Sequence, residues 1–175
     1  LAYPHERGVV HRDIKPENIL LDASTGRAMV TDFGIARVAE AAPLTMTGQV
    51  LGSVHYMSPE QVSGDKLDGR SDLYSLGVVA FQALSGRLPF DNESASAVIV
   101  AHVTKAAPSL ATVAPQLPPA LVSVVDACLA KAPEARYATG TALARALDEA
   151  WNGGAGGVFS PPLLSERQAQ AVWQR

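Results

Sequence analysis

The chain has 175 residues, of which 47% are hydrophobic and 18% charged, and its formal net charge is −3. A chain of this length buries about two-thirds of its unfolded surface, so we expect one domain with a real core, plus a tail. The composition excludes wholesale disorder, and the weak, evenly spread charge argues against nucleic acid or an anionic membrane as a partner.

The single cysteine, Cys128, cannot form an internal disulfide, so we expect a cytoplasmic protein stabilised by packing in a reducing compartment. It lies in the apolar helical pattern LVSVVDACLAKAP, which predicts a buried, unreactive thiol. The longest apolar stretch, residues 73–84, is well short of the roughly 20 residues that span a bilayer. We therefore expect no membrane segment within this chain, and whether a parent protein is membrane-anchored stays open.

In chain order, residues 1–7 have the pattern of the last turns of a helix that Gly8 ends. Residues 8–37 alternate short apolar runs with turn signals, which predicts short paired strands around polar loops. Residues 38–58 show no sustained period and are rich in small and hydroxyl residues, so we expect a loop there.

After Ser58 the sequence becomes largely helical, and Pro59 suits a first helical position. The hydrophobic spacing predicts helices over residues 59–63, 70–84, 94–104, 119–131 and 139–151. The predicted fold class is therefore mainly α with short β-hairpins. We expect one domain over residues 1–151 and, because GGAGG and SPP follow the last helix, a Gly/Pro-rich linker and tail over residues 152–175.

The stretch HRDIKPEN, residues 11–18, places three kinds of functional group close together. Phosphoryl transfer to a hydroxyl needs a carboxylate that accepts the proton, a cation beside the phosphate, and oxygen ligands for magnesium. Asp13, Lys15 and Asn18 supply one of each, and Asp32 can add a second metal ligand. Each residue alone is commoner as a turn former or solvated charge, but a chance match to seven fixed positions is on the order of one in a billion.

Three motifs resemble those of protein kinases: HRDIKPEN, DFG (32–34) and SPE (58–60), which are similar to the catalytic loop, the metal-binding segment and the end of the activation segment. The stretches GSVHYMSPEQ and GRSDLYSLGVVAFQALSGRLPF are most similar to bacterial eukaryotic-like serine/threonine kinases. The resemblance covers residue 1 to about residue 151 and implies the helical large lobe of the protein-kinase fold.

The resemblance assigns roles to matching positions. Asp13 would be the catalytic base, Lys15 would contact the transferring phosphate, and Asn18 and Asp32 would hold Mg²⁺, so Lys15, Asn18 and Asp32 would together bind the ATP–magnesium complex. Ser53 matches the hydroxyl residue that bonds the catalytic loop and shapes the acceptor site in serine/threonine kinases. The implied partners are ATP and proteins that carry serine or threonine acceptors.

Regulation is implied by Arg12, which in the family can pair with a phosphorylated residue of the activation loop. Thr45 and Thr47 are placed to be that residue. A phosphate there would bring close to two negative charges and order the loop through arginine contacts. The alternative is that both threonines are ordinary small polar loop residues.

Three further residues resemble architectural positions of the family. Glu60 and Arg136 are similar to the buried ion pair that closes the helical lobe, and Asp72 is similar to the acid that anchors the backbone of the catalytic loop. Loss of one partner of a buried pair costs about 3–5 kcal/mol without touching the chemistry.

The sequence departs from the family pattern in one important way, because it contains no glycine-rich loop and no lysine in a V-A-I-K-like strand. Its other lysines, Lys66, Lys105 and Lys131, lie in predicted turns or at helix ends. We therefore expect the small nucleotide-binding lobe to be absent, the 175 residues to be a nearly inactive fragment of a serine/threonine kinase, and apolar surface to be exposed around residues 1–10 and 19–35.

Two alternatives stay open. One is a non-catalytic helical-lobe module that binds substrates or regulators through helices near residues 94–131. The other is a small-molecule phosphotransferase of the antibiotic-kinase type, which shares an H-x-D-x-x-x-x-N loop but usually lacks DFG and SPE.

Overall fold

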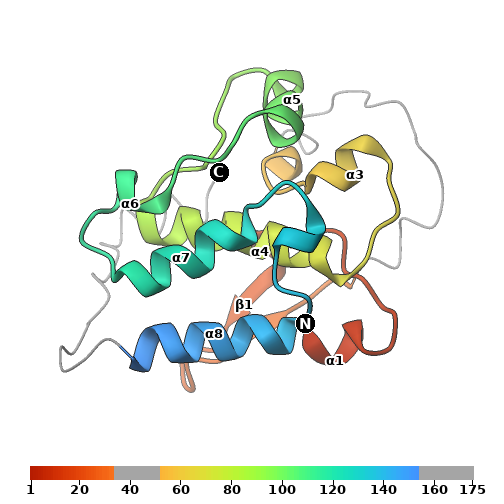
Figure 1. The fold of residues 1–175 in the computed structure, drawn as a ribbon. Helices are drawn as coiled ribbons and strands as arrows, with labels where there is room; N and C mark the ends of the chain where they lie inside the picture. Colours follow the sequence, from red (N-terminus) through yellow and green to blue (C-terminus); the bar gives the residue numbers. More distant parts are fainter. Residues whose placement is uncertain (34–51, 154–175) are drawn as a thin grey trace.

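The computed structural model describes residues 1–33 and 52–153, and within them the chain is mainly helical with one two-stranded sheet (Figure 1). The helices are α1 (Ala2–His5), α3 (Pro59–Ser63), α4 (Gly69–Ser85), α5 (Ala95–Thr104), α6 (Leu110–Val113), α7 (Pro119–Cys128) and α8 (Gly140–Asn152), with short 3-10 helices η1 (Pro16–Asn18) and η2 (Pro133–Ala135). The strands are β1 (Ile19–Leu21) and β2 (Ala28–Val30).

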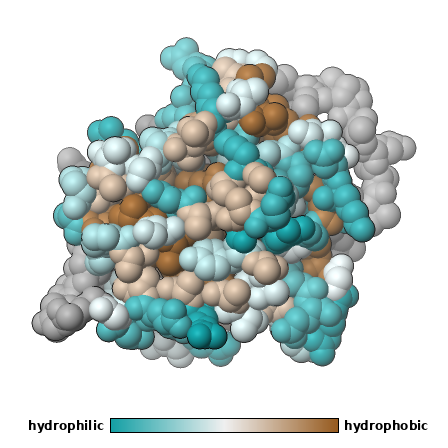
Figure 2. Space-filling model, viewed as in Figure 1, coloured by the Kyte–Doolittle hydropathy of each residue, from teal (hydrophilic) through white to brown (hydrophobic). Residues whose placement is uncertain are grey.

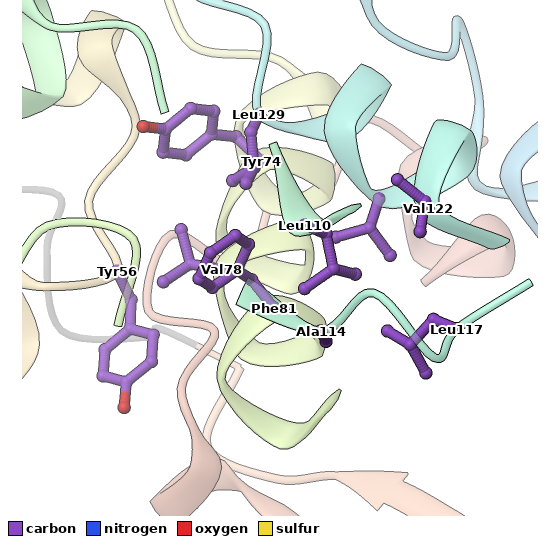
Figure 3. Packing of buried hydrophobic residues seen from close by; sticks show 10 residues of the cluster. Tyr56, Tyr74, Val78, Phe81, Leu110, Ala114, Leu117, Val122 and Leu129 are labelled. Atoms are coloured by element: carbon purple, nitrogen blue, oxygen red, sulfur yellow. The ribbon is translucent and has the colours of Figure 1, made fainter. Parts of the chain in front are cut away.

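Helix α4 forms the centre of the fold. It begins after the N-cap Asp68, whose carboxylate accepts a hydrogen bond from the backbone N–H of the second helical residue, and it ends at Gly86, whose φ of 71° lies in the left-handed region that glycine tolerates. The side chains of Tyr74, Val78 and Phe81 are fully buried (Figure 3). They pack in one cluster with Tyr56, Leu110, Ala114, Leu117, Val122, Val125 and Leu129. The apolar run 73–84 is thus a buried core helix, as predicted.

The contact between α4 and α7 is unusually close at Gly77. A Cβ atom added to Gly77 would lie 2.6 Å from the Cβ of Cys128, so only glycine fits there. Cys128 is buried, which confirms the predicted environment of the thiol, and burial raises its pKa to about 12. The thiol is therefore protonated at neutral pH and has the character of a core residue.

Two further clusters extend the core. Val54, just before α3, packs with Phe90 and with Ala95, Val98 and Ala101 of α5. On the other side of α4, α8 packs against α7 and α1, and its buried Leu143 and Ala150 meet Leu73, Val124 and Cys128. Figure 1 shows α5 and α8 at opposite ends of the molecule, with α4 and α7 between them.

The predicted helices occur close to their expected positions, with two differences. The helix expected over 119–131 ends at Cys128, and beyond its end the carbonyl groups of Ala130 and Lys131 accept hydrogen bonds from the Arg136 guanidinium at 2.7 and 2.8 Å. Helix α6 was not predicted. It is a single turn that Ser109 caps by accepting from the backbone N–H of Ala111 at 3.3 Å, and its first N–H, that of Leu110, donates to a carboxylate oxygen of Asp126 on α7.

The paired strands expected within residues 8–37 reduce, in the described part of that range, to one antiparallel hairpin, in which Ile19, Leu20 and Leu21 pair with Val30, Met29 and Ala28. Residues 8–10 belong to no strand. Helix α1 ends at His5, with Glu6 as its C-cap, so it is shorter than the helix expected over residues 1–7, and Gly8, with a φ of 71°, lies in the turn that follows. The tail from residue 154 onward lies outside the described residues, so the linker assignment stays a prediction.

Large apolar side chains are exposed in the two segments where the sequence predicts them. Tyr3, Val9, Leu20, Leu21 and Met29 have exposed fractions between 45% and 67%. Val100, Val103 and Trp151 are also exposed. Figure 2 shows apolar residues between hydrophilic ones on one face, with hydrophilic residues along the edge that α8 forms. Among the described helices, none is both long enough and apolar enough to cross a bilayer.

Candidate active site

The backbone of residues 11 and 12 is fixed by one buried acid. Asp72 lies in the first turn of α4 and is 1% exposed. It accepts hydrogen bonds from the backbone N–H of His11 at 2.7 Å, from that of Arg12 at 2.8 Å, and from Nε2 of His5 at 2.8 Å. Asp72 thus anchors the loop that carries the predicted catalytic residues, as the sequence suggested, and His5 is a donor that sequence reasoning missed.

A second anchor is the ring of His11, which is fully buried. Its Nε2 donates to the carbonyl of Thr31 at 2.8 Å, and its Nδ1 accepts from the backbone N–H of Asp13 at 3.2 Å, which sets the neutral tautomer. The ring also meets Phe33 edge-on, with centroids 4.8 Å apart. His11 therefore joins the loop at residues 11–18 to the segment that carries Asp32.

Four predicted site residues lie together around one carboxylate. Asn18 donates through Nδ2 to the Asp13 carbonyl at 2.8 Å and to Asp13 Oδ2 at 3.1 Å. Lys15 Nζ lies 2.9 Å from the same Oδ2 and donates to Ser53 Oγ at 2.9 Å. The side chain of Asp13 is 43% exposed, so an incoming hydroxyl group can reach it. The structure thus brings Asp13, Lys15, Asn18 and Ser53 into one polar cluster.

Asp32 is brought to the same end of the hairpin as Asn18. The register of β1 and β2 pairs Ile19 with Val30, and the next residue, Thr31, donates its N–H to the Asn18 carbonyl at 2.9 Å. Asp32 follows directly, is exposed, and has a φ of 54° in the left-handed region. Gly34, the last residue of the DFG motif, lies outside the described residues.

The residues present fit a magnesium ion better than a transition metal. Because Nδ2 of Asn18 donates to Asp13, the atom that Asn18 can offer to a cation is its amide oxygen, and Asp32 can offer its carboxylate. The described residues contain no group of three His, Cys, Asp or Glu side chains that could hold a metal. Two oxygen ligands from the protein, completed by phosphate and water, are the usual arrangement for Mg²⁺.

The predicted regulatory and architectural residues divide into two groups. Arg12 is exposed at the loop, whereas Thr45 and Thr47 lie outside the described residues, so their phosphorylation stays a prediction.

Glu60 and Arg136 form the expected buried pair, with Nη1 to Oε1 at 2.7 Å and Nη2 to Oε2 at 2.9 Å. Burial alone would raise the pKa of Glu60, but hydrogen bonds from Arg136 and from a neighbouring hydroxyl hold this pKa below its usual value.

The geometry therefore defines a polar cluster in which an accessible carboxylate lies beside an ammonium group, on a loop that buried hydrogen bonds hold in place. The protein is therefore a mainly helical lobe that carries this polar cluster on a loop beside its short hairpin. The sequence model of the protein kinase domain matches residues 1–151, so the chain belongs to the protein kinase domain family.

Individual relatives are bacterial. The chain is 48% identical over 154 residues to the serine/threonine-protein kinase Pkn1 of Myxococcus xanthus. This match covers 86% of this chain and 22% of the relative. It is 45% identical over 139 residues to PrkC of Bacillus subtilis, covering 79% of this chain and 21% of that kinase. It is 43% identical over 147 residues to PknA of Mycobacterium tuberculosis, covering 84% and 33%. The chain thus spans a third or less of the length of these relatives.

Among solved structures, the kinase domain of PknI from Mycobacterium tuberculosis is similar, with a TM-score of 0.60 and 29% identity. The match covers 85% of this chain and 49% of that domain. The shared part agrees with the predicted helical lobe of a kinase fold.

Proposed function

We propose that this chain supplies the catalytic loop and metal ligands of an ATP-dependent serine/threonine protein kinase. The observation that carries the proposal is the double contact of one carboxylate oxygen: Asp13 Oδ2 meets the amide of Asn18 and the ammonium of Lys15, which also bonds Ser53. Asp13 is the base, Lys15 contacts the transferring phosphate, and Asn18 and Asp32 are the metal ligands.

Each side chain has a distinct task in this proposal. Asp13 orients the acceptor hydroxyl and takes up its proton as the bond to phosphorus forms. Lys15 is held between Asp13 and Ser53, so its ammonium group needs only a small displacement to contact a phosphate oxygen. Magnesium, when bound, neutralises charge on the phosphate oxygens. Asn18 keeps Asp13 in place through two hydrogen bonds while its amide oxygen stays available to the ion.

The proposed substrates are ATP and proteins with serine or threonine acceptors. The bond from Lys15 to Ser53 supports this class, because the resemblance associates a lysine two positions after the base, together with this hydroxyl residue, with serine/threonine kinases. The names of the relatives point to the same class.

We also propose that residues 1–175 by themselves transfer phosphate very slowly. Their sequence contains no glycine-rich loop and, besides Lys15, no lysine in a V-A-I-K-like strand that could contact the nucleotide. The exposed Leu20, Leu21 and Met29 follow the metal ligand Asn18 along the hairpin and offer an apolar surface that a nucleotide-binding lobe can cover. Because this reaction depends on positioning, losing half of the nucleotide site costs many orders of magnitude in rate.

A chimera tests the proposal. The nucleotide-binding lobe of Myxococcus xanthus Pkn1 is joined in front of Leu1, and phosphate transfer from labelled ATP to casein is measured. We expect turnover by the chimera and almost none by residues 1–175. Asp13→Asn in the chimera lowers kcat by about 10²–10⁴-fold, because general-base catalysis is lost. The matched control is Asp22→Asn, an acid in the exposed hairpin turn, which leaves kcat unchanged.

Two results contradict the proposal: a folded chimera that binds ATP without turnover, or a chimera in which Asp13→Asn is as active as its parent. The first result would favour the second candidate, a non-catalytic binding module. Two observations support that candidate: Val100 and Val103 of α5 are exposed, and Pro108 and Lys131 help to line a pocket of about 240 Å³.

A further inference from the structure

The backbone of Arg12, directly before the proposed base, has an uncommon conformation. Its φ is 69°, in the left-handed region that side chains other than glycine rarely adopt. Such a conformation persists where the surroundings hold it. Both backbone polar groups of Arg12 are in fact bonded to side chains: its N–H donates to Asp72 Oδ1 at 2.8 Å, and its carbonyl accepts from Gln61 Nε2 at 2.7 Å.

Gln61 can make this bond because the other end of its carboxamide is already used. The side-chain Oε1 of Gln61 accepts from the backbone N–H of Ser58 at 3.0 Å, and the backbone N–H of Gln61 donates to Ser58 Oγ at 3.3 Å. These two bonds form the capping box at the start of α3. With Oε1 directed to the cap, the amide nitrogen is turned toward Arg12.

Gln61 also lies beside the proposed chemistry. It lines one small cavity together with Arg12, Asp13 and Ser53. Its side chain is thus a direct link between the first turn of α3, at the end of the activation segment, and the backbone that carries the base.

We propose that Gln61 is a positioning residue: its carboxamide holds Arg12 in the left-handed conformation and thereby fixes the direction of Asp13. The expected effect on phosphoryl transfer rests on the proposed function, whereas the effect on the order of the loop stands without it. The same side chain therefore caps a helix and sets the geometry of the catalytic loop.

Three substitutions separate these two tasks. Gln61→Glu keeps an oxygen acceptor for the Ser58 N–H, since a capping box accepts Glu as well as Gln, but it places an oxygen opposite the Arg12 carbonyl. Gln61→Met removes both side-chain hydrogen bonds, the one to the Ser58 N–H and the one to the Arg12 carbonyl, without adding charge. Ser58→Ala removes the capping hydroxyl and leaves the bond from Gln61 to Arg12 intact.

The first measurement is amide hydrogen exchange by NMR on residues 1–175. We expect the amides of Arg12 and Asp13 to exchange about tenfold faster in Gln61→Glu and Gln61→Met, because the loop opens more often. In Ser58→Ala these amides exchange at the parent rate, although α3 itself exchanges faster.

The second measurement uses the active chimera. We expect kcat to fall about tenfold in Gln61→Glu and Gln61→Met with KM for ATP unchanged, since the cavity that Gln61 lines includes neither Asn18 nor Asp32. Parent exchange rates at Arg12 and Asp13 in both Gln61 variants would overturn the proposal, and so would parent kcat in both variants of an active chimera. A chimera without turnover would instead remove the proposed function, and the exchange measurement would still decide the role of Gln61.

Discussion

Two ion pairs, Glu60–Arg136 in the scaffold and Asp13–Lys15 in the candidate site, differ in their burial and in the number of hydrogen bonds that hold them. Glu60 and Arg136 are almost completely buried and joined by two hydrogen bonds, and the Arg136 guanidinium also donates to the carbonyls of Arg70, Ala130 and Lys131. Asp13 and Lys15 meet through one contact of 2.9 Å, with side chains that are 43% and 20% exposed.

This difference indicates that the first pair has a structural role and that the second belongs to the candidate site. All the Arg136 contacts are made inside the protein and connect the segments around α3, α4 and η2, so the pair fixes the arrangement of the lobe. Lys15, by contrast, contacts Asp13 at a partly exposed site, where an ion pair contributes little free energy, so in the proposed function it can exchange this contact for one with a phosphate oxygen.

The largest expected effect comes from breaking the scaffold pair. Arg136→Met leaves the Glu60 carboxylate buried without its cation and removes the donor for three carbonyl groups. We expect the free energy of unfolding to fall by about 3–5 kcal/mol. Lys15→Met is the matched variant in the site pair, and we expect a change below about 1 kcal/mol because that pair is partly exposed and joined by a single contact. Urea denaturation followed by circular dichroism measures both.

The double variant Glu60→Gln/Arg136→Met sharpens the comparison. It should recover part of the lost stability, because no buried charge is left unpaired. Equal losses in Arg136→Met and Lys15→Met would contradict the division between scaffold and site.

A smaller effect is expected at Asp22, an exposed acid in the turn of the hairpin. Hydrogen bonds from the side chain and backbone of Ser24 and from the hydroxyl of Thr25 lower its pKa to about 2. Because the folded pKa is lowered, this contribution to stability is present above about pH 4, where the unfolded acid is ionised, and is lost as the pH falls through about 2. An NMR titration of the Asp22 carboxyl group should give a midpoint near 2.

Ser24→Ala should move that midpoint upward toward the ordinary value for aspartate, whereas Ser63→Ala, a serine of α3 remote from the turn, should not. A midpoint near 4 in the parent chain would show that exposure alone, rather than local hydrogen bonding, sets the state of this acid.

Much of the helical lobe could be predicted from local signals. The serine, proline and glycine residues around α3 and α4 fix where these helices begin and end, and the structure agrees within one residue. The bonds that Arg136 donates just beyond the end of α7, and the bond that Asp126 accepts from the first residue of α6, come instead from other segments. No property of the local sequence reports such contacts.

The candidate site divides in the same way. The motif HRDIKPEN identified Asp13, Lys15 and Asn18, and the structure brings them together with Ser53. The roles of His5 and Gln61 were missed. The spacing of Ser58 and Gln61 is a capping-box signal that the sequence offers, but the second bond of Gln61, to a residue 49 positions away, becomes visible only in the folded chain.

The claim that underlies the account is that Asn18 and Asp32 hold a divalent ion beside Asp13. Paramagnetic broadening by Mn²⁺ in NMR spectra of residues 1–175 tests it most directly, because weak binding suffices. We predict that the signals of residues 18, 19 and 32 broaden first and that Asp32→Ala abolishes the effect, whereas Asp22→Asn preserves it. Broadening centred elsewhere, or unchanged in Asp32→Ala, would contradict the account.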